Sequence, residues 1–186
     1  MTDARFERTR TVVHEAVCSV LVDDGLAGLT VDRLAAEAGV ARSTIYRNWP
    51  DMAGLACEVF DELVHREQIE FTGSVEDQLK AYLLDYAERL NNEVYTAVLL
   101  AVIEAANRDD AFADVHRRMF NQTRSRAGEI VRQGQRAGVF DTRLDVQQCV
   151  EDIVAPFLYR RLVRQVAITR AQVNELHAEL LRRWSP

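Results

Sequence analysis

The segment Thr30–Trp49, TVDRLAAEAGVARSTIYRNW, decides how this chain folds. Thr30 is a favourable N-cap, so a short helix is expected to begin after it. Gly39 ends that helix, because glycine adopts a positive φ without a Cβ clash. A second short helix spans Arg42 to Asn48, and Pro50 closes it by disfavouring helical geometry at Trp49. Two short helices joined by a tight turn are typical of a helix-turn-helix.

The two faces of this second helix differ in chemistry. Val40 and Ile45 are predicted to point into a small core, and the small side chain of Ala35 lets the two helices approach each other. The remaining residues form a short, polar and basic outer face, which suits a probe of the DNA major groove. They are Arg42, Ser43, Thr44, Tyr46, Arg47 and Asn48.

Outside this segment, apolar residues recur at helical spacing toward both ends of the chain, and no stretch alternates as a strand would. We therefore predict an all-α protein of about nine helices. The expected organisation is a three-helix DNA-binding domain at 1–50, a connecting helix at 51–73, and a helical ligand-binding and dimerisation domain at 74–186. N-cap patterns at Ser74, Asp145 and Thr169 each mark the start of a helix.

The composition fits a globular protein, with 48% hydrophobic and 28% charged residues. No apolar run approaches the roughly 18 residues of a membrane span, and the start has no signal-peptide pattern. We expect a cytoplasmic protein with no membrane partner. Cys18, Cys57 and Cys149 lie far apart, without the spacing of metal ligands, and are expected to be buried, reduced thiols.

The charge is unusual for a protein that binds DNA. The net charge is −6, and residues 1–67 hold seven arginines against twelve aspartates and glutamates. Since phosphate neutralisation needs cations, two small basic spots must carry the contacts. One is formed by Arg5, Arg8 and Arg10, and the other by Arg42 and Arg47. Weak non-specific DNA affinity is expected.

The segment resembles the tetracycline-repressor (TetR) family of bacterial transcriptional regulators. The matching positions are Leu34-Ala35, Ala38-Gly39-Val40, Thr44-Ile45-Tyr46 and Trp49. Softer similarity continues at Arg136–Phe140 and Ala155-Pro156-Phe157. The resemblance implies a homodimer that binds a double-stranded, palindromic operator, most often as a repressor that responds to a small-molecule effector.

The resemblance also implies roles for individual residues. Tyr46 and Thr44 would bind phosphates, and Arg42 and Arg47 would approach bases or phosphates. Thr30 would place a backbone N–H at a phosphate, at the positive end of its helix. Both arginines could instead be solvated surface charges, and Tyr46 could be a packing residue.

Several residues depart from the family pattern. Ala41 replaces a frequent serine, and losing that N-cap should cost about 1 kcal/mol. Ser43 replaces the usual glycine or proline, and Asn48 and Trp49 stand where histidine and phenylalanine are frequent. Met52 occupies the place of a phosphate-binding lysine in many members, so one backbone contact per subunit is expected to be missing.

The C-terminal half is expected to dimerise and to bind the effector. The resemblance implies a four-helix bundle made by the last two helices of each subunit, and Pro156 should kink the first of them. The residues predicted at this interface, about half of which could instead form ordinary core, are Val150, Ile153, Val154, Phe157, Leu176, Leu180 and Trp184. The residues predicted to contact an effector, or else to form ordinary core, are Tyr82, Tyr86, Tyr95, Leu99, Phe112, His116 and Phe120.

Two other functions stay open from the sequence. An enzyme is disfavoured, since no catalytic or nucleotide-binding motif is present and Glu62 with His65 is a weak pair. No cofactor, metal or catalytic residue is therefore expected. A helical adaptor that has lost strong DNA binding is the alternative, and the acidic N-terminal region and Met52 favour it.

Overall fold

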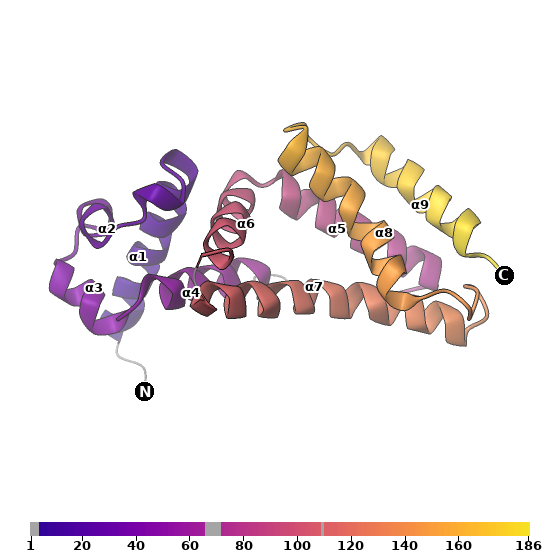
Figure 1. Ribbon diagram of the computed structural model, residues 1–186, viewed down its shortest axis with the longest axis horizontal. Coiled ribbons are helices and arrows are strands. Elements are labelled where there is room, and N and C mark those ends of the chain that lie inside the picture. The colour runs from indigo at the N-terminus through magenta and orange to yellow at the C-terminus, as the bar shows by residue number, and fades with distance from the viewer. Residues whose placement is uncertain (1–3, 66–71, 109) are drawn as a thin grey trace. The chain divides into compact units, whose positions relative to one another are not determined.

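The computed structural model describes residues 4–65, 72–108 and 110–186. Every regular element in these ranges is helical, which confirms the all-α prediction and the expected nine α-helices. The first elements are α1 (Ala4–Asp23), η1 (Leu26–Gly28), α2 (Val31–Ala38), α3 (Arg42–Asn48) and α4 (Met52–His65). Then follow α5 (Val75–Asn91), α6 (Glu93–Ala106), α7 (Asp110–Arg136), α8 (Val146–Leu158), η2 (Tyr159–Val163) and α9 (Arg170–Trp184) (Figure 1).

The predicted caps are present at the starts of three helices. The side chains of Ser74 and Asp145 accept hydrogen bonds from backbone N–H groups in the first turns of α5 and α8. Thr169 and Gln172 form a capping box at the start of α9. Each cap satisfies donors that have no partner within the helix, so these residues fix where the helices begin.

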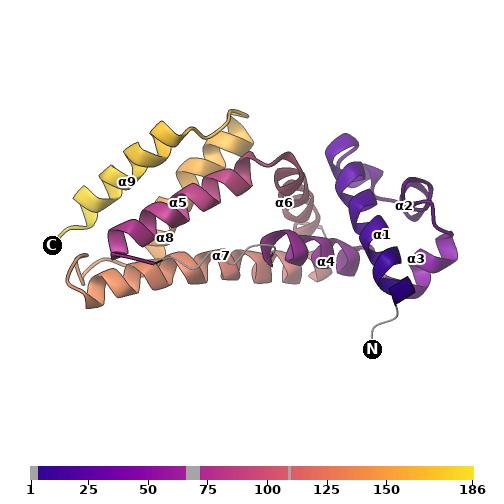
Figure 2. The ribbon, with the colours of Figure 1, turned by 180° about the vertical axis from the view of Figure 1, so that it is seen from behind.

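The helices pack into two compact units that interleave along the chain. The first unit takes residues 1–67 and 93–119, and the second takes 68–92 and 120–186. Within the first, α1 packs against α2, α4 and α6; within the second, α9 lies beside α5 and α8 (Figure 2). The division at residues 50 and 73 stays a prediction, because the units follow packing rather than chain order.

Each unit buries its own apolar core. In the first, Val13, Val17 and Val20 form a fully buried stripe on α1. In the second, Phe140 and Trp184 meet edge to face, with ring centroids 5.4 Å apart. Burial of such side chains contributes roughly 1.5–3 kcal/mol each, so the cores hold the short helices in place.

Pro156 lies inside α8, as the sequence requires, and removes one backbone donor from that helix. A wider, π-type turn (η2) follows directly. Across the residues that the structure describes, no helix is both long enough and apolar enough to cross a bilayer. Cys149 is buried, whereas the side chains of Cys57 and His65 lie outside the described part of the chain.

Candidate nucleic-acid interface

The helix-turn-helix forms as its sequence predicts. Thr30 caps α2, and its hydroxyl oxygen accepts a hydrogen bond from the backbone N–H of Arg33 at 3.2 Å. Gly39 ends α2 with a φ of 64°, a left-handed conformation that glycine adopts readily. Leu34 is fully buried beneath the turn. The turn is therefore fixed by one cap, one glycine and one core residue.

Helix α3 has two distinct sides. Ile45 and Trp49, four residues apart, are buried at 0% and 4% exposure. Tyr46 is 60% exposed. Of the other residues predicted to contact DNA, Thr30, Arg42, Ser43 and Arg47 are exposed, whereas Thr44 and Asn48 are half-buried. The helix thus presents a polar outer face above a buried anchor.

The arginines of this segment differ in their electrostatic surroundings. Arg33 pairs with Asp24 at 3.4 Å and with Glu37 at 3.1 Å. Arg42 pairs with Asp32, its Nε lying 2.8 Å from the carboxylate. Among the described residues no carboxylate lies within ion-pair distance of Arg47. Carboxylates on or near α2 therefore offset the positive charges of Arg33 and Arg42 but, in the described part of the chain, not that of Arg47.

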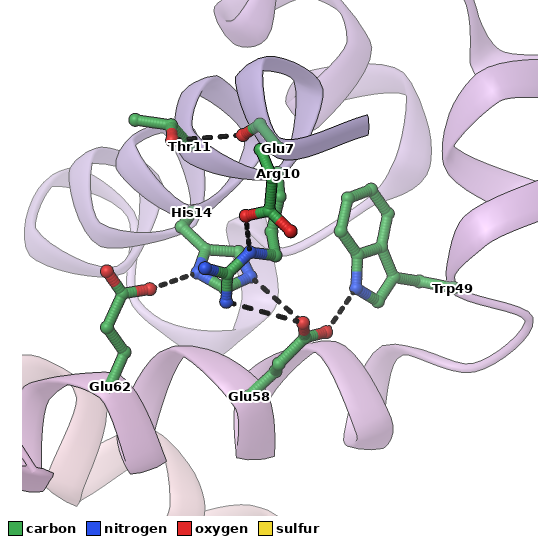
Figure 3. A network of polar contacts seen from close by, with 7 residues as sticks. All are labelled: Glu7, Arg10, Thr11, His14, Trp49, Glu58 and Glu62. Atoms are coloured by element: carbon green, nitrogen blue, oxygen red, sulfur yellow. Dashed lines mark hydrogen bonds and ion pairs between the residues drawn. The ribbon is translucent and has the colours of Figure 1, made fainter. Parts of the chain in front are cut away.

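A polar network lies behind α3 and joins α1, α4 and the residue that ends α3 (Figure 3). The indole N–H of Trp49 donates to the carboxylate of Glu58 at 2.5 Å. His14 of α1 places Nδ1 2.7 Å from the carboxylate of Glu62. Arg10 donates to Glu7 at 3.1 Å and lies 3.9 Å from Glu58. The buried side of the helix-turn-helix is held by charge as well as by apolar packing.

The residues predicted to bind an effector are divided between the two units. In the second unit, Tyr82 stacks on Tyr86, and its hydroxyl donates to the carbonyl oxygen of Thr123 at 3.1 Å. Tyr86 also stacks on Phe157, and Phe120 is half-buried. These tyrosines therefore pack within the core of their own unit.

The first unit holds the other four predicted effector residues. Tyr95, Leu99 and Phe112 are buried, and Phe112 packs with Ala56 and Ala105. His116 is half-buried, and desolvation lowers its pKa from the ordinary value. The role of all seven residues in ligand binding stays a prediction.

The residues predicted at the dimer interface differ in their burial within the single chain, and their role in dimerisation stays a prediction. Five of the seven residues are buried inside the single chain, with exposures of 3% or less: Val150, Ile153, Phe157, Leu180 and Trp184. They lie in the second unit, where α5, α8 and α9 contact one another. Val154 and Leu176 are half-buried and remain accessible. The nearby side chains of Tyr159 and Val163 are large and apolar, and they are 59% and 66% exposed.

Two family models cover most of the chain. One, described as bacterial regulatory proteins of the tetR family, matches residues 15–59. The other, described as the tetracyclin repressor-like C-terminal domain, matches residues 69–180, which is more than half of the chain. The chain belongs to the tetR family. It is a helix-turn-helix transcriptional regulator that binds DNA, and the members of this family are regulators rather than enzymes.

Relatives and solved structures agree with this assignment. An uncharacterized HTH-type transcriptional regulator of Bacillus subtilis, YdeS, is 26% identical over 174 residues, covering 92% of this chain and 87% of YdeS. A TetR regulator from Agrobacterium tumefaciens has the same fold, with a TM-score of 0.76, 19% identity, and coverage of 96% and 94%. FadR from Bacillus subtilis, solved with stearoyl-CoA, has a TM-score of 0.74, 17% identity, and coverage of 92% and 97%.

The polar network behind α3 of this tetR-family regulator was not predicted from the sequence. Glu58 lies nine residues beyond Trp49, and His14 lies 48 residues before Glu62. No local pattern links such distant positions. A usable signal was the pair of acids Glu58 and Glu62, spaced by four in a helix of mostly apolar residues, together with a histidine beside the apolar stripe of α1.

Proposed function

We propose that this regulator binds a two-fold symmetric operator as a homodimer and inserts α3 of each subunit into the major groove. The observation that carries the proposal is the outer face of α3, where an exposed Tyr46 and Arg47 lie above the buried Ile45 and Trp49. A side chain can read DNA only if the helix beneath it is held in place. Repression is the mode we propose for its action on transcription.

The proposed DNA contacts sort into two kinds. Thr30, Thr44 and Tyr46 offer hydroxyl or backbone donors that suit phosphates, so they would set the register of the protein on DNA. Arg47, which has no carboxylate partner in the described chain, would approach a base edge or a phosphate. Ser43 and Asn48 would make the shorter polar contacts beside it.

The dimer proposal rests on the surface of α8, η2 and α9. A groove between α8 and α9 is lined by apolar and charged side chains, including Pro156, Tyr159, Leu176 and Arg183. A two-fold axis would bring this surface against its own copy and place two recognition helices on one duplex. The protomer–dimer equilibrium is measured by analytical ultracentrifugation, and Tyr159→Arg is expected to weaken the dimer.

Effector control is part of the proposal. An effector that binds a DNA-free conformation more tightly than the DNA-bound one must weaken operator binding, by reciprocal linkage. FadR was solved with stearoyl-CoA, but at 17% identity that structure shares only the fold with this chain. The test therefore begins with a screen for small molecules that raise the unfolding temperature of this chain. Each such compound is then added to the operator titration, where an effector should lower operator affinity.

The direct experiment is selection of bound fragments from a random DNA library with the full-length chain. A two-fold symmetric site is the expected result. Tyr46→Phe and Arg47→Ala should then weaken binding to that site without changing the unfolding temperature. Absence of any bound fragment at low salt would favour the adaptor instead, as the net charge of −6 and the two ion-paired arginines suggest.

A further inference from the structure

Helix α3 depends on tertiary contacts for its stability and its position. It has seven residues, and its N-cap, Ala41, offers no side-chain hydrogen bond. Isolated helices shorter than about 12–15 residues are marginal in water. The placement of the DNA-facing side chains therefore depends on what anchors the buried residues Ile45 and Trp49.

Trp49 is anchored by a polar bond as well as by packing. Its ring stacks on Phe6, with centroids 6.2 Å apart, and its indole N–H donates to Oε2 of Glu58 at 2.5 Å. Hydrogen bonds to an ionised acceptor are stronger than those between neutral groups. Phenylalanine at this position would keep the ring contact and lose the donor, so the tryptophan adds a directional link from α3 to α4.

The other oxygen of Glu58 faces two cationic or titratable groups of α1. Oε1 lies 3.9 Å from Nη1 of Arg10 and 3.9 Å from Nε2 of His14 (Figure 3). The Nε2 atom of His14 is buried and has no hydrogen-bond partner. Glu58 thus stands where α1, α4 and the end of α3 meet, and its charge is balanced from the α1 side.

We propose that Glu58 is a positioning residue for DNA recognition, which acts by holding Trp49. The carboxylate sets the end of α3 against α1 and α4, so the exposed face of α3 is already ordered before DNA arrives. Preorganisation reduces the ordering cost of binding, and it favours the one site that fits the fixed face. This inference rests on the proposed function, because it assigns α3 as the helix that reads DNA.

The test compares Trp49→Phe and Glu58→Gln with the wild-type chain on the operator selected by wild type. Trp49→Phe removes one donor without changing charge. Loss of a hydrogen bond to a charged group predicts about a tenfold loss of operator affinity. Affinity for unrelated DNA should stay the same, so the ratio of specific to non-specific binding falls. Glu15 is an exposed acid of α1, and Glu15→Gln therefore controls for the loss of one negative charge.

A double-mutant cycle separates positioning through Trp49 from a general effect of each side chain. If Glu58 acts by holding Trp49, Glu58→Gln should cause no further loss in the Trp49→Phe background. If Trp49→Phe fails to fold, Glu58→Gln carries the test, because glutamine has nearly the same size and weakens the hydrogen bond from Trp49 by removing the charge of its acceptor.

Three results would overturn the inference. If Trp49→Phe and Glu58→Gln lower the unfolding temperature but keep the wild-type ratio of specific to non-specific DNA affinity, both residues act on stability alone. Additive losses would show that Glu58 acts independently of Trp49. A wild-type chain that selects no DNA site would remove the proposed function together with this inference, whereas the first two results leave the proposed function intact.

Discussion

Asp32 is expected to restrain DNA binding by competing with phosphate for Arg42. The carboxylate lies 2.8 Å from Nε of Arg42, and both side chains are exposed. When the outer face of α3 meets DNA, Arg42 must leave this partner before it can neutralise a phosphate. The carboxylate also repels the phosphate itself. Asp32→Asn removes both effects and keeps a side chain of the same size, so operator affinity should rise.

The expected gain in operator affinity follows from the exposure of the Asp32–Arg42 ion pair. Exposed ion pairs contribute about 0.2–1 kcal/mol, because water screens them strongly. A dimer carries the change twice, which gives roughly 1–2 kcal/mol when repulsion of the phosphate is included. That corresponds to about five- to thirtyfold tighter binding. A released Arg42 in each subunit should also steepen the plot of log affinity against log salt, by about 0.9 for each new phosphate contact.

The assay is a fluorescence-anisotropy titration of labelled operator at several salt concentrations. Asp23→Asn is the matched control, because it removes one exposed aspartate of the same unit for which no arginine partner is described. In an Arg42→Ala background the gain from Asp32→Asn should shrink, since the competitor no longer has a target. Operator affinity of Asp32→Asn no higher than that of Asp23→Asn, or an unchanged salt slope, would contradict competition between Asp32 and phosphate for Arg42.

Three further predictions concern the second unit. Gly134→Ala should lower the free energy of unfolding by about 1–3 kcal/mol in a urea titration, because a methyl group there would overlap the ring of Phe140. Arg143 hydrogen-bonds Asp141 and lowers the pKa of that carboxyl from 3.8 to about 2, so the stabilisation that it gives persists above the ordinary pKa and is lost as the pH falls toward 2. Arg143→Ala should therefore move the NMR titration of Asp141 to higher pH. Burial raises the pKa of Cys149 to about 11, so a thiol reagent at pH 8 should label it slowly until urea unfolds the chain.

The local chemistry of residues 30–49 was enough to predict the helix-turn-helix. Thr30 as a cap, Gly39 at a positive φ and the break before Pro50 act over a few residues, so no distant contact is needed to recognise them. The missing cap at Ala41 was visible in the same way. Periodicity placed the other helices, because each apolar stripe must face a core.

The sequence could not distinguish the core of one chain from a surface shared by two. Val150, Ile153, Phe157, Leu180 and Trp184 are apolar at helical spacing, as residues of either kind would be. Their burial within the protomer depends on how α5, α8 and α9 pack, and that packing brings together residues about a hundred positions apart, such as Glu76 and His177. The same limit applies to the tyrosines expected near an effector.

The amino-acid sequence alone determined the short-range features of the protein. These are the starts and ends of helices, the glycine turn and the polar face of α3. Only the packing of the helices decided which polar side chains meet. Arg42 faces Asp32, and Trp49 faces Glu58, because burial of their apolar sides sets the angles between consecutive helices. Caps and turns act through bonds between neighbours, whereas polar contacts between different helices depend on distances that no local sequence pattern sets.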